Sequence, residues 1–201
     1  MKFLAFTDIH GDISILKHFG HVINKEKVDA ALCAGDITNW SSGTNKVLKA
    51  MNDLKIPVFF IHGNHDSEEE IRTLIKKYKN LHFVHNNVSI FRDEAVIVGI
   101  GGGGFSIESS QFEKICKGLK KNKKEWSKKK LIVLSHAPPY GTVLDEIYGD
   151  HVGNKNIRRF IISEKPIFAI SGHIHETMHM MGVLKDTIVM NPGDDGELIE
   201  L

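Results

Sequence analysis

The chain has 201 residues, of which 41% are hydrophobic and 25% are charged, and its formal net charge at pH 7 is +1. This composition is ordinary for a globular protein, and the length suits one domain with a substantial core. A net charge near zero excludes the strong overall field that draws proteins to nucleic acid or anionic membranes.

The first two thirds of the chain alternate between strand-like and helix-like segments. Short, mainly apolar runs predict strands at residues 2–7, 29–34 and 57–61. Helical patterns run from a turn at Gly11 to about residue 25, over 45–54, and from 68 to about 77. Ser67 and the three glutamates after it are typical of an N-cap and an acidic first turn.

The remaining segments are mostly short strands. We expect strands at 81–85, 88–91, 95–100, 131–135, 167–171, 177–183, 186–190 and 197–201. Two helices are expected at 108–124 and 155–164, and residues 137–152 are expected to be mostly loop. Strands that first alternate with helices and then follow in quick succession predict two packed sheets flanked by helices, in one domain over 1–201.

Five short polar motifs each follow an apolar run. They are Asp8-Ile9-His10, Gly35-Asp36, Gly63-Asn64-His65-Asp66, Ser135-His136 and Gly172-His173-Ile174-His175. Open α/β sheets bind ligands outside the carboxyl ends of their strands, so these motifs should converge on one place. In extended chain, residues two apart point the same way, so Asp8 and His10 can hold one ion together. Asn64 and His65 should diverge, one toward metal and the other toward substrate.

Besides His65 and Asp66, the motifs supply two carboxylates, one amide oxygen and four imidazoles. These are ligands for borderline divalent ions, and two ions about 3.5–4 Å apart drive in-line attack on phosphorus. A lone Asp-x-His usually forms a capped turn, and Gly-Asp after a strand is a common helix entry. All five motifs in order, each at a strand end, predict a two-metal phosphoesterase.

Taken in order, the motifs resemble those of the calcineurin-like metallophosphoesterase family, over residues 8–175. The segment 135–141 is similar to small archaeal and bacterial members, which in turn resemble class III cyclic-nucleotide phosphodiesterases and animal metallophosphoesterase-domain proteins. The resemblance implies an α/β fold, a four-layer α/β/β/α sandwich of two mixed sheets flanked by helices. Many members carry a second acidic residue after Gly-Asp, where this chain has Ile37-Thr38-Asn39-Trp40.

The resemblance also implies roles for the motif residues. The first metal would be bound by Asp8, His10, Asp36 and His175, and the second by Asp36, Asn64, His136 and His173. His65 would face the leaving group without binding metal, and Asp66 would orient it. Two divalent ions are therefore expected as cofactors, with Mn²⁺ favoured and Fe, Zn²⁺, Co²⁺ or Ni²⁺ as alternatives.

The expected function is hydrolysis of a small-molecule phosphodiester by in-line attack of a hydroxide that bridges the metals. A phosphomonoesterase or a nuclease with the same site is the alternative. A non-catalytic interaction scaffold of this fold is less favoured, because every ligand position is retained. The eight lysines of 117–130 are typical of a solvated helix face, and nucleic-acid binding there is not favoured. The oligomeric state is not indicated.

Cysteine content and hydropathy predict the compartment. The two cysteines, Cys33 and Cys116, suggest no disulfide framework and fit a reducing environment. The apolar N-terminus is too short for a signal sequence, because Asp8 and His10 interrupt it at once. Nothing approaches the roughly 18 apolar residues that span a bilayer. We therefore expect a cytoplasmic protein with no membrane partner.

Overall fold

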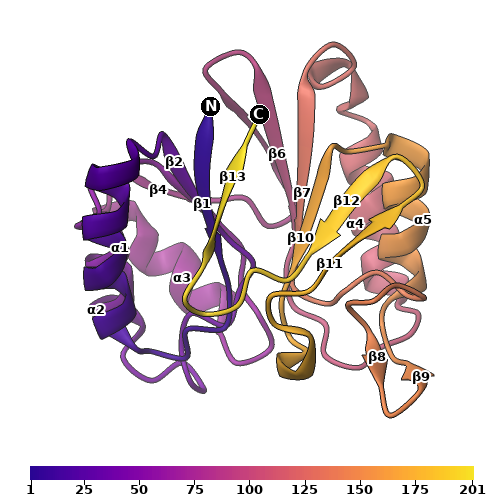
Figure 1. The fold of residues 1–201 in the computed structure, drawn as a ribbon, viewed down its shortest axis with the longest axis horizontal. Coiled ribbons are helices and arrows are strands. Elements are labelled where there is room, and N and C mark those ends of the chain that lie inside the picture. Colours follow the sequence, from indigo (N-terminus) through magenta and orange to yellow (C-terminus); the bar gives the residue numbers. More distant parts are fainter.

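Two mixed β-sheets pack face to face, and helices cover the outer face of each (Figure 1). The structure is a computed structural model that describes residues 1–201 except for the side chain of Glu125. The first sheet has the order β13-β1-β2-β3-β4. Its strands are β1 (Lys2–Phe6), β2 (Ala30–Cys33), β3 (Val58–Phe60), β4 (Leu81–Phe83) and β13 (Glu197–Glu200). Strands β1 to β4 are parallel, and β13 runs antiparallel to β1.

The second sheet has the order β11-β12-β10-β7-β6-β5. Its strands are β5 (Val88–Phe91), β6 (Ala95–Ile100), β7 (Lys130–Ser135), β10 (Phe168–Ser171), β11 (Met181–Leu184) and β12 (Thr187–Met190). The four inner strands are parallel, while β5 and β11 pair antiparallel at the two edges.

Five helices complete the layers. The helices α1 (Ile13–Glu26), α2 (Thr44–Asn52) and α3 (Glu68–Leu74) pack on the first sheet, with a 3₁₀ turn η1 (Ile75–Lys77) after α3. The helices α4 (Ser110–Lys120) and α5 (Lys155–Glu164) pack on the second sheet. This arrangement confirms the predicted four-layer α/β/β/α sandwich.

The strands explain why the sequence gives apolar runs rather than alternation. In β2, Ala30 and Leu32 face the core between the two sheets, whereas Ala31 and Cys33 face the core beneath the helices. All four residues are buried. A parallel strand covered on both faces must be apolar on both, so periodicity of two is lost.

Three predicted segments differ most from the structure. The predicted helix 108–124 ends at Lys120, and a 3₁₀ turn η2 (Lys123–Glu125) follows, which brings Trp126 into the core. The predicted loop 137–152 contains a small hairpin, β8 (Glu146–Ile147) and β9 (Asp150–His151). The predicted strand 177–183 begins only at Met181, because a 3₁₀ turn η3 (His175–Thr177) precedes it.

Buried hydrogen bonds hold these irregular segments. The Asp145 carboxylate is fully buried and accepts hydrogen bonds from the backbone N–H groups of Gly141, Thr142 and Gly153. Asp145 therefore connects the segment before the hairpin to the segment after it. The Thr177 hydroxyl donates to the carbonyl of Leu144 at 3.1 Å, which ties η3 to the same loop.

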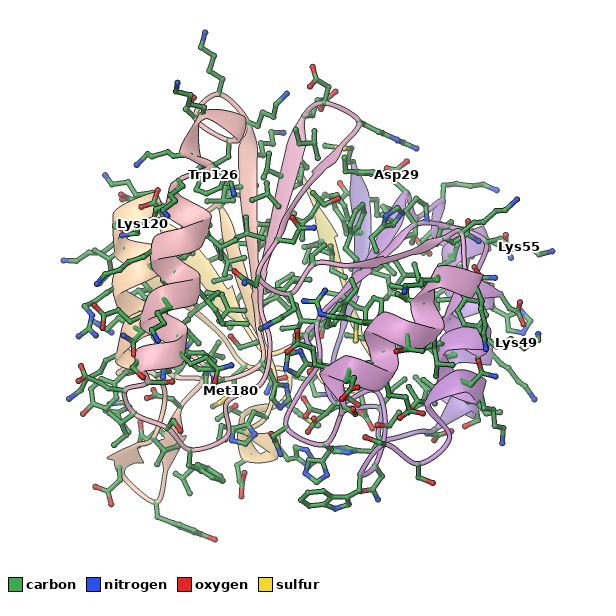
Figure 2. All side chains as sticks on the ribbon, turned by 180° about the vertical axis from the view of Figure 1, so that it is seen from behind. Asp29, Lys49, Lys55, Lys120, Trp126 and Met180 are labelled. Atoms are coloured by element: carbon green, nitrogen blue, oxygen red, sulfur yellow. The ribbon has the colours of Figure 1, made fainter. Side chains whose placement is uncertain are left out.

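The lysine-rich segment lies away from the strand ends that carry the motifs. Figure 2 shows Lys120 and Trp126 in the upper part of the molecule and Met180 lower down. Several of its lysines form ion pairs, since Lys120 and Lys123 both approach Glu164, at 3.5 and 3.1 Å. This arrangement fits a solvated surface. None of the helices in the described chain has the length and apolar character needed to cross a membrane.

Candidate metal centre

Polar side chains from five strand ends meet at one edge of the sandwich. The strands concerned are neighbours within their sheets, β1, β2 and β3 in one and β7 and β10 in the other. Their carboxyl ends point the same way, toward the lower edge in Figure 1. The residues that follow the apolar runs therefore lie together at this edge: Asp8, His10, Asp36, Asn64, His65, Asp66, His136, His173 and His175.

One group of donors consists of Asp8, His10 and His175. The Nε2 atoms of His10 and His175 are 3.3 Å apart. They lie 3.9 and 3.7 Å from Asp8 Oδ1. Two imidazole nitrogens and one carboxylate oxygen thus surround a single point, a set that suits a borderline divalent ion.

A second group is built around Asp36, His136 and Asn64. The His136 Nε2 atom is 3.4 Å from Asp36 Oδ2 and 2.9 Å from Asn64 Oδ1. Its Nδ1 atom lies 2.9 Å from the carbonyl oxygen of Ala34, to which it can donate. Histidines that bind metal commonly donate their other nitrogen in this way, which leaves Nε2 free as the ligand.

Asp36 lies between the two groups. Its Oδ2 atom is 4.0 Å from His10 Nε2 on one side, besides its contact with His136 on the other. Its Oδ1 atom accepts a hydrogen bond from the backbone N–H of His65 at 2.8 Å. The carboxylate is 2% exposed and held in place, so it is positioned to contact two ions at once.

The backbone at the site is tightly turned rather than extended. Asp8, His10 and Asp36 have φ angles of +52°, +43° and +48°. This differs from the extended chain assumed for Asp8 and His10. Hydrogen bonds between the loops hold these conformations, for example Asp8 N–H to the Gly35 carbonyl at 3.0 Å. Left-handed non-glycine residues cost about 1–3 kcal/mol each and cluster at functional sites.

His173 and His65 each present a buried, unpaired nitrogen. The Nε2 of His173 and the Nδ1 of His65 have no hydrogen-bond partner among the described residues. The His173 ring is 5.2 Å from that of His136, and its backbone N–H donates to Asp8 at 3.0 Å. A buried imidazole nitrogen without a hydrogen-bond partner suits the expected role of His173 as a metal ligand. His65 Nε2 is 4.0 Å from Asp36 Oδ2, the same distance as His10 Nε2.

Asp66 differs from its expected role. Its carboxylate accepts hydrogen bonds from the backbone N–H groups of Ile37, Thr38 and Gly63, and from the Thr38 hydroxyl at 2.7 Å. Within the described chain, no hydrogen bond joins it to the His65 ring. A partly buried carboxylate facing four donors is satisfied by them, so Asp66 fixes the loop that carries His65 rather than the imidazole itself.

The charges of the site follow from burial and neighbours. Burial raises the pKa of Asp8, but the nearby imidazoles of His175 and His136 and the hydrogen bond from the Thr7 hydroxyl outweigh it, so its pKa is lowered. Burial lowers the pKa of His173 to about 4. Burial also opposes charge on His136, but Asp36 and Asp8 raise its pKa to about 9. Asp8 is thus an anion and His173 neutral, the forms that bind metal, while His136 must release a proton.

The family model for calcineurin-like phosphoesterases matches residues 1–177. The chain belongs to this family. Members generally hold two divalent ions, and the donor groups described above fit such a pair. The fold, the family and the site together support a metal-dependent phosphoesterase.

Individual relatives span nearly the whole chain. An uncharacterised protein of Methanocaldococcus jannaschii is 29% identical and covers 96% of this chain and 88% of its own length. A probable glycerophosphodiester phosphodiesterase, GpdQ, of Arcobacter nitrofigilis is 26% identical and covers 86% of this chain and 66% of its own. The crystal structure of TT1561 of Thermus thermophilus superposes with a TM-score of 0.78 at 18% identity, covering 96% and 89%. The last similarity shows a shared fold alone.

Two aromatic residues at the site were missed by sequence reasoning. The Trp40 ring centroid is 4.4 Å from that of His65, and the Phe105 centroid is 4.7 Å from that of His173. Phe105 lines a cleft of about 340 Å³ together with the candidate ligands and Glu176. The available signal was an aromatic residue in a polar loop just after Asp36, and another directly after the four glycines 101–104.

Proposed function

We propose that this calcineurin-like phosphoesterase hydrolyses a small-molecule phosphodiester with two bound divalent ions. The observation that carries the proposal is the position of Asp36. Its carboxylate lies between the donors Asp8, His10 and His175 on one side and Asn64 and His136 on the other. His173, with its unpaired Nε2, completes the second group.

Two divalent ions, when bound, supply an activated water nucleophile and neutralise charge on the phosphoryl oxygens. The mixed imidazole, carboxylate and amide donors suit first-row divalent metals, and Mn²⁺ is the proposed occupant. The residues themselves fix the positions of the ions, because Thr7, the His173 backbone N–H and the Ala34 carbonyl hold the ligands from behind.

His65 is proposed to act on the leaving group. Its side chain is 25% exposed and opens onto the cleft, while its backbone is hydrogen-bonded to Asp36. A histidine in this position can donate a proton to the departing alkoxide or stabilise its charge. General acid catalysis of this kind typically contributes about 10²–10⁴-fold.

The outer lining of the cleft favours a diester over a monoester. Phe105 and Glu176 lie at the cleft beside the candidate ligands, so an apolar and an acidic side chain border the position of the substrate. A diester carries one negative charge at neutral pH and a monoester nearly two. The similarity to a probable glycerophosphodiester phosphodiesterase agrees with this preference.

The experiment uses protein stripped of metal, reloaded with Mn²⁺, and assayed with bis-p-nitrophenyl phosphate and p-nitrophenyl phosphate in parallel. A higher kcat/KM for the diester is the expected result, and Asp36→Asn should abolish it. A preference for the monoester would overturn the diester assignment. No turnover of either compound, with two ions bound per chain, would overturn the proposed function altogether.

A further inference from the structure

An unusual turn follows Asp36. The backbone N–H of Ser42 donates to the carbonyl of Asn39 at 3.0 Å, which closes a four-residue turn. The two central residues, Trp40 and Ser41, have φ angles of +50° and +57°. Turns with two positive φ angles favour Asn, Asp and Gly, and a bulky residue in this region is an outlier. A large aromatic side chain is therefore kept where the backbone disfavours it.

The turn is fixed to the loop of the proposed leaving-group histidine. The backbone N–H of Ser41 donates to the carbonyl of His65 at 2.9 Å. The indole of Trp40 packs against the His65 imidazole, with the rings inclined at 51°. The strained residue is thus held beside His65 by both backbone and side chain.

Most of the Trp40 side chain remains uncovered. The residue is 75% exposed, so the imidazole covers only part of the indole. Leaving a tryptophan in water forgoes much of the stabilisation that its burial would bring. Backbone strain and exposure both destabilise the free protein. The conformation that carries these two costs places an aromatic surface next to the reaction centre.

A second exposed aromatic side chain borders the site from the other sheet. Phe105 follows the glycine run after β6, whereas Trp40 follows β2. Phe105 is 64% exposed and packs against His173, which lies after β10 in the second sheet. One aromatic residue thus borders a histidine from the first sheet and the other a histidine from the second sheet.

We infer that Trp40 and Phe105 form a stacking subsite for a planar aromatic ring carried by the substrate, with Trp40 beneath the ring of the leaving group. The inference rests on the proposed function, because it is the assignment of His65 to the leaving group that orients the subsite. The ring belongs either to a nucleobase or to an aryl alcohol, which share this stacking chemistry. Stacking of a base on an aromatic side chain corresponds to roughly a tenfold effect on binding.

The kinetic test compares methyl phosphodiesters with and without an aromatic ring on the second alcohol. Adenosine 5′-methyl phosphate and ribose 5-methyl phosphate differ only in the base, and benzyl methyl phosphate supplies the aryl arm. We expect a lower KM for the compounds that carry a ring. Trp40→Ala should raise their KM about tenfold, Trp40→Phe should restore most of it, and Phe105→Ala should raise it less. The KM of the ribose compound should stay unchanged.

Tyr148→Ala is the matched control. Tyr148 is fully exposed in the turn between β8 and β9, so its removal deletes an exposed aromatic ring outside the proposed subsite. We expect it to leave all the kinetic constants unchanged. Equal losses on ring-bearing and ring-free diesters in Trp40→Ala would overturn the subsite, because they would assign Trp40 to the positioning of His65 alone.

A binding measurement separates the subsite from the proposed function. The chain has two tryptophans, and Trp126 is only 4% exposed, so added ligands should quench mainly Trp40. Adenosine 5′-phosphate or benzyl phosphate should quench the emission, ribose 5-phosphate should not, and Trp40→Phe should remove the response. Quenching that persists in Trp40→Phe, or none with either ring compound, would overturn the subsite. Failure to hydrolyse any diester would instead overturn the proposed function.

Discussion

Replacing Gly172 with alanine should displace the Asp8 carboxylate and with it the first group of metal donors. A Cβ atom at this position would lie 2.0 Å from Thr7 Oγ1 and 2.2 Å from Asp8 Oδ2. Neither side chain can retreat easily, since Thr7 is fully buried and Asp8 is 3% exposed. The backbone of Gly172 is also fixed, because its N–H donates to the His136 carbonyl at 3.1 Å.

The expected loss of stability has two parts. Overpacking a buried position by a methyl group costs about 1–3 kcal/mol. Moving the carboxylate also breaks its hydrogen bonds from the Thr7 hydroxyl, at 2.7 Å, and from the His173 backbone N–H, at 3.0 Å. Hydrogen bonds to charged groups contribute about 1.5–3 kcal/mol. We therefore expect the free energy of unfolding to fall by at least roughly 4 kcal/mol, out of the 5–15 kcal/mol typical of a domain.

Urea unfolding of the metal-free protein measures this loss, and metal analysis after reloading measures the effect on the site. Gly20→Ala is the control, since Gly20 lies in α1 and a Cβ there meets nothing within 4 Å. It should be neutral or stabilise by about 0.5–1 kcal/mol. A Gly172→Ala protein with wild-type stability and full metal content would show that the added methyl group does not displace Asp8.

Three further predictions concern the carboxylates of Asp66 and Asp145 and the two buried thiols. Asp66→Asn should lower the free energy of unfolding by about 1–3 kcal/mol and reduce activity, because an amide NH₂ would face donors that now bind a carboxylate. Urea unfolding and turnover measure the two effects, and wild-type values of both would contradict this role. Asp145→Ala should speed hydrogen exchange at the three backbone amides that bind it, and unchanged exchange would contradict its role. Burial raises the pKa of Cys33 well above its usual value and that of Cys116 to about 11. At pH 8 both thiols are therefore protonated, and neither should react with Ellman's reagent until the protein is unfolded; reaction in the native state would contradict their burial.

The layers and the location of the site could be predicted from sequence because both depend on local patterns. An apolar run such as residues 30–34 is typical of a strand covered on both faces, and the polar motif Gly63-Asn64-His65-Asp66, directly after the run 57–61, has no role in the core. Parallel strands bring such residues to one edge. The donor groups around Asp36 follow from that topology.

Features that depend on contacts between distant segments could not be predicted. The left-handed conformation of Asp8 is held by the Gly35 carbonyl, from another strand end. Three of the four hydrogen bonds to Asp66 come from residues 37 and 38, which its own motif does not reveal. The position of Trp40 over His65 likewise depends on the Ser41 hydrogen bond to the His65 carbonyl.

The metal content of three proteins tests whether Asp36 holds two ions while His65 binds none. Wild type, His65→Ala and Asp36→Asn are stripped, reloaded with Mn²⁺, desalted and analysed by inductively coupled plasma mass spectrometry. We predict two ions per chain in wild type and in His65→Ala, with turnover lost in the latter, and loss of metal in Asp36→Asn. Two ions retained in Asp36→Asn, or equal metal loss in both variants, would contradict it.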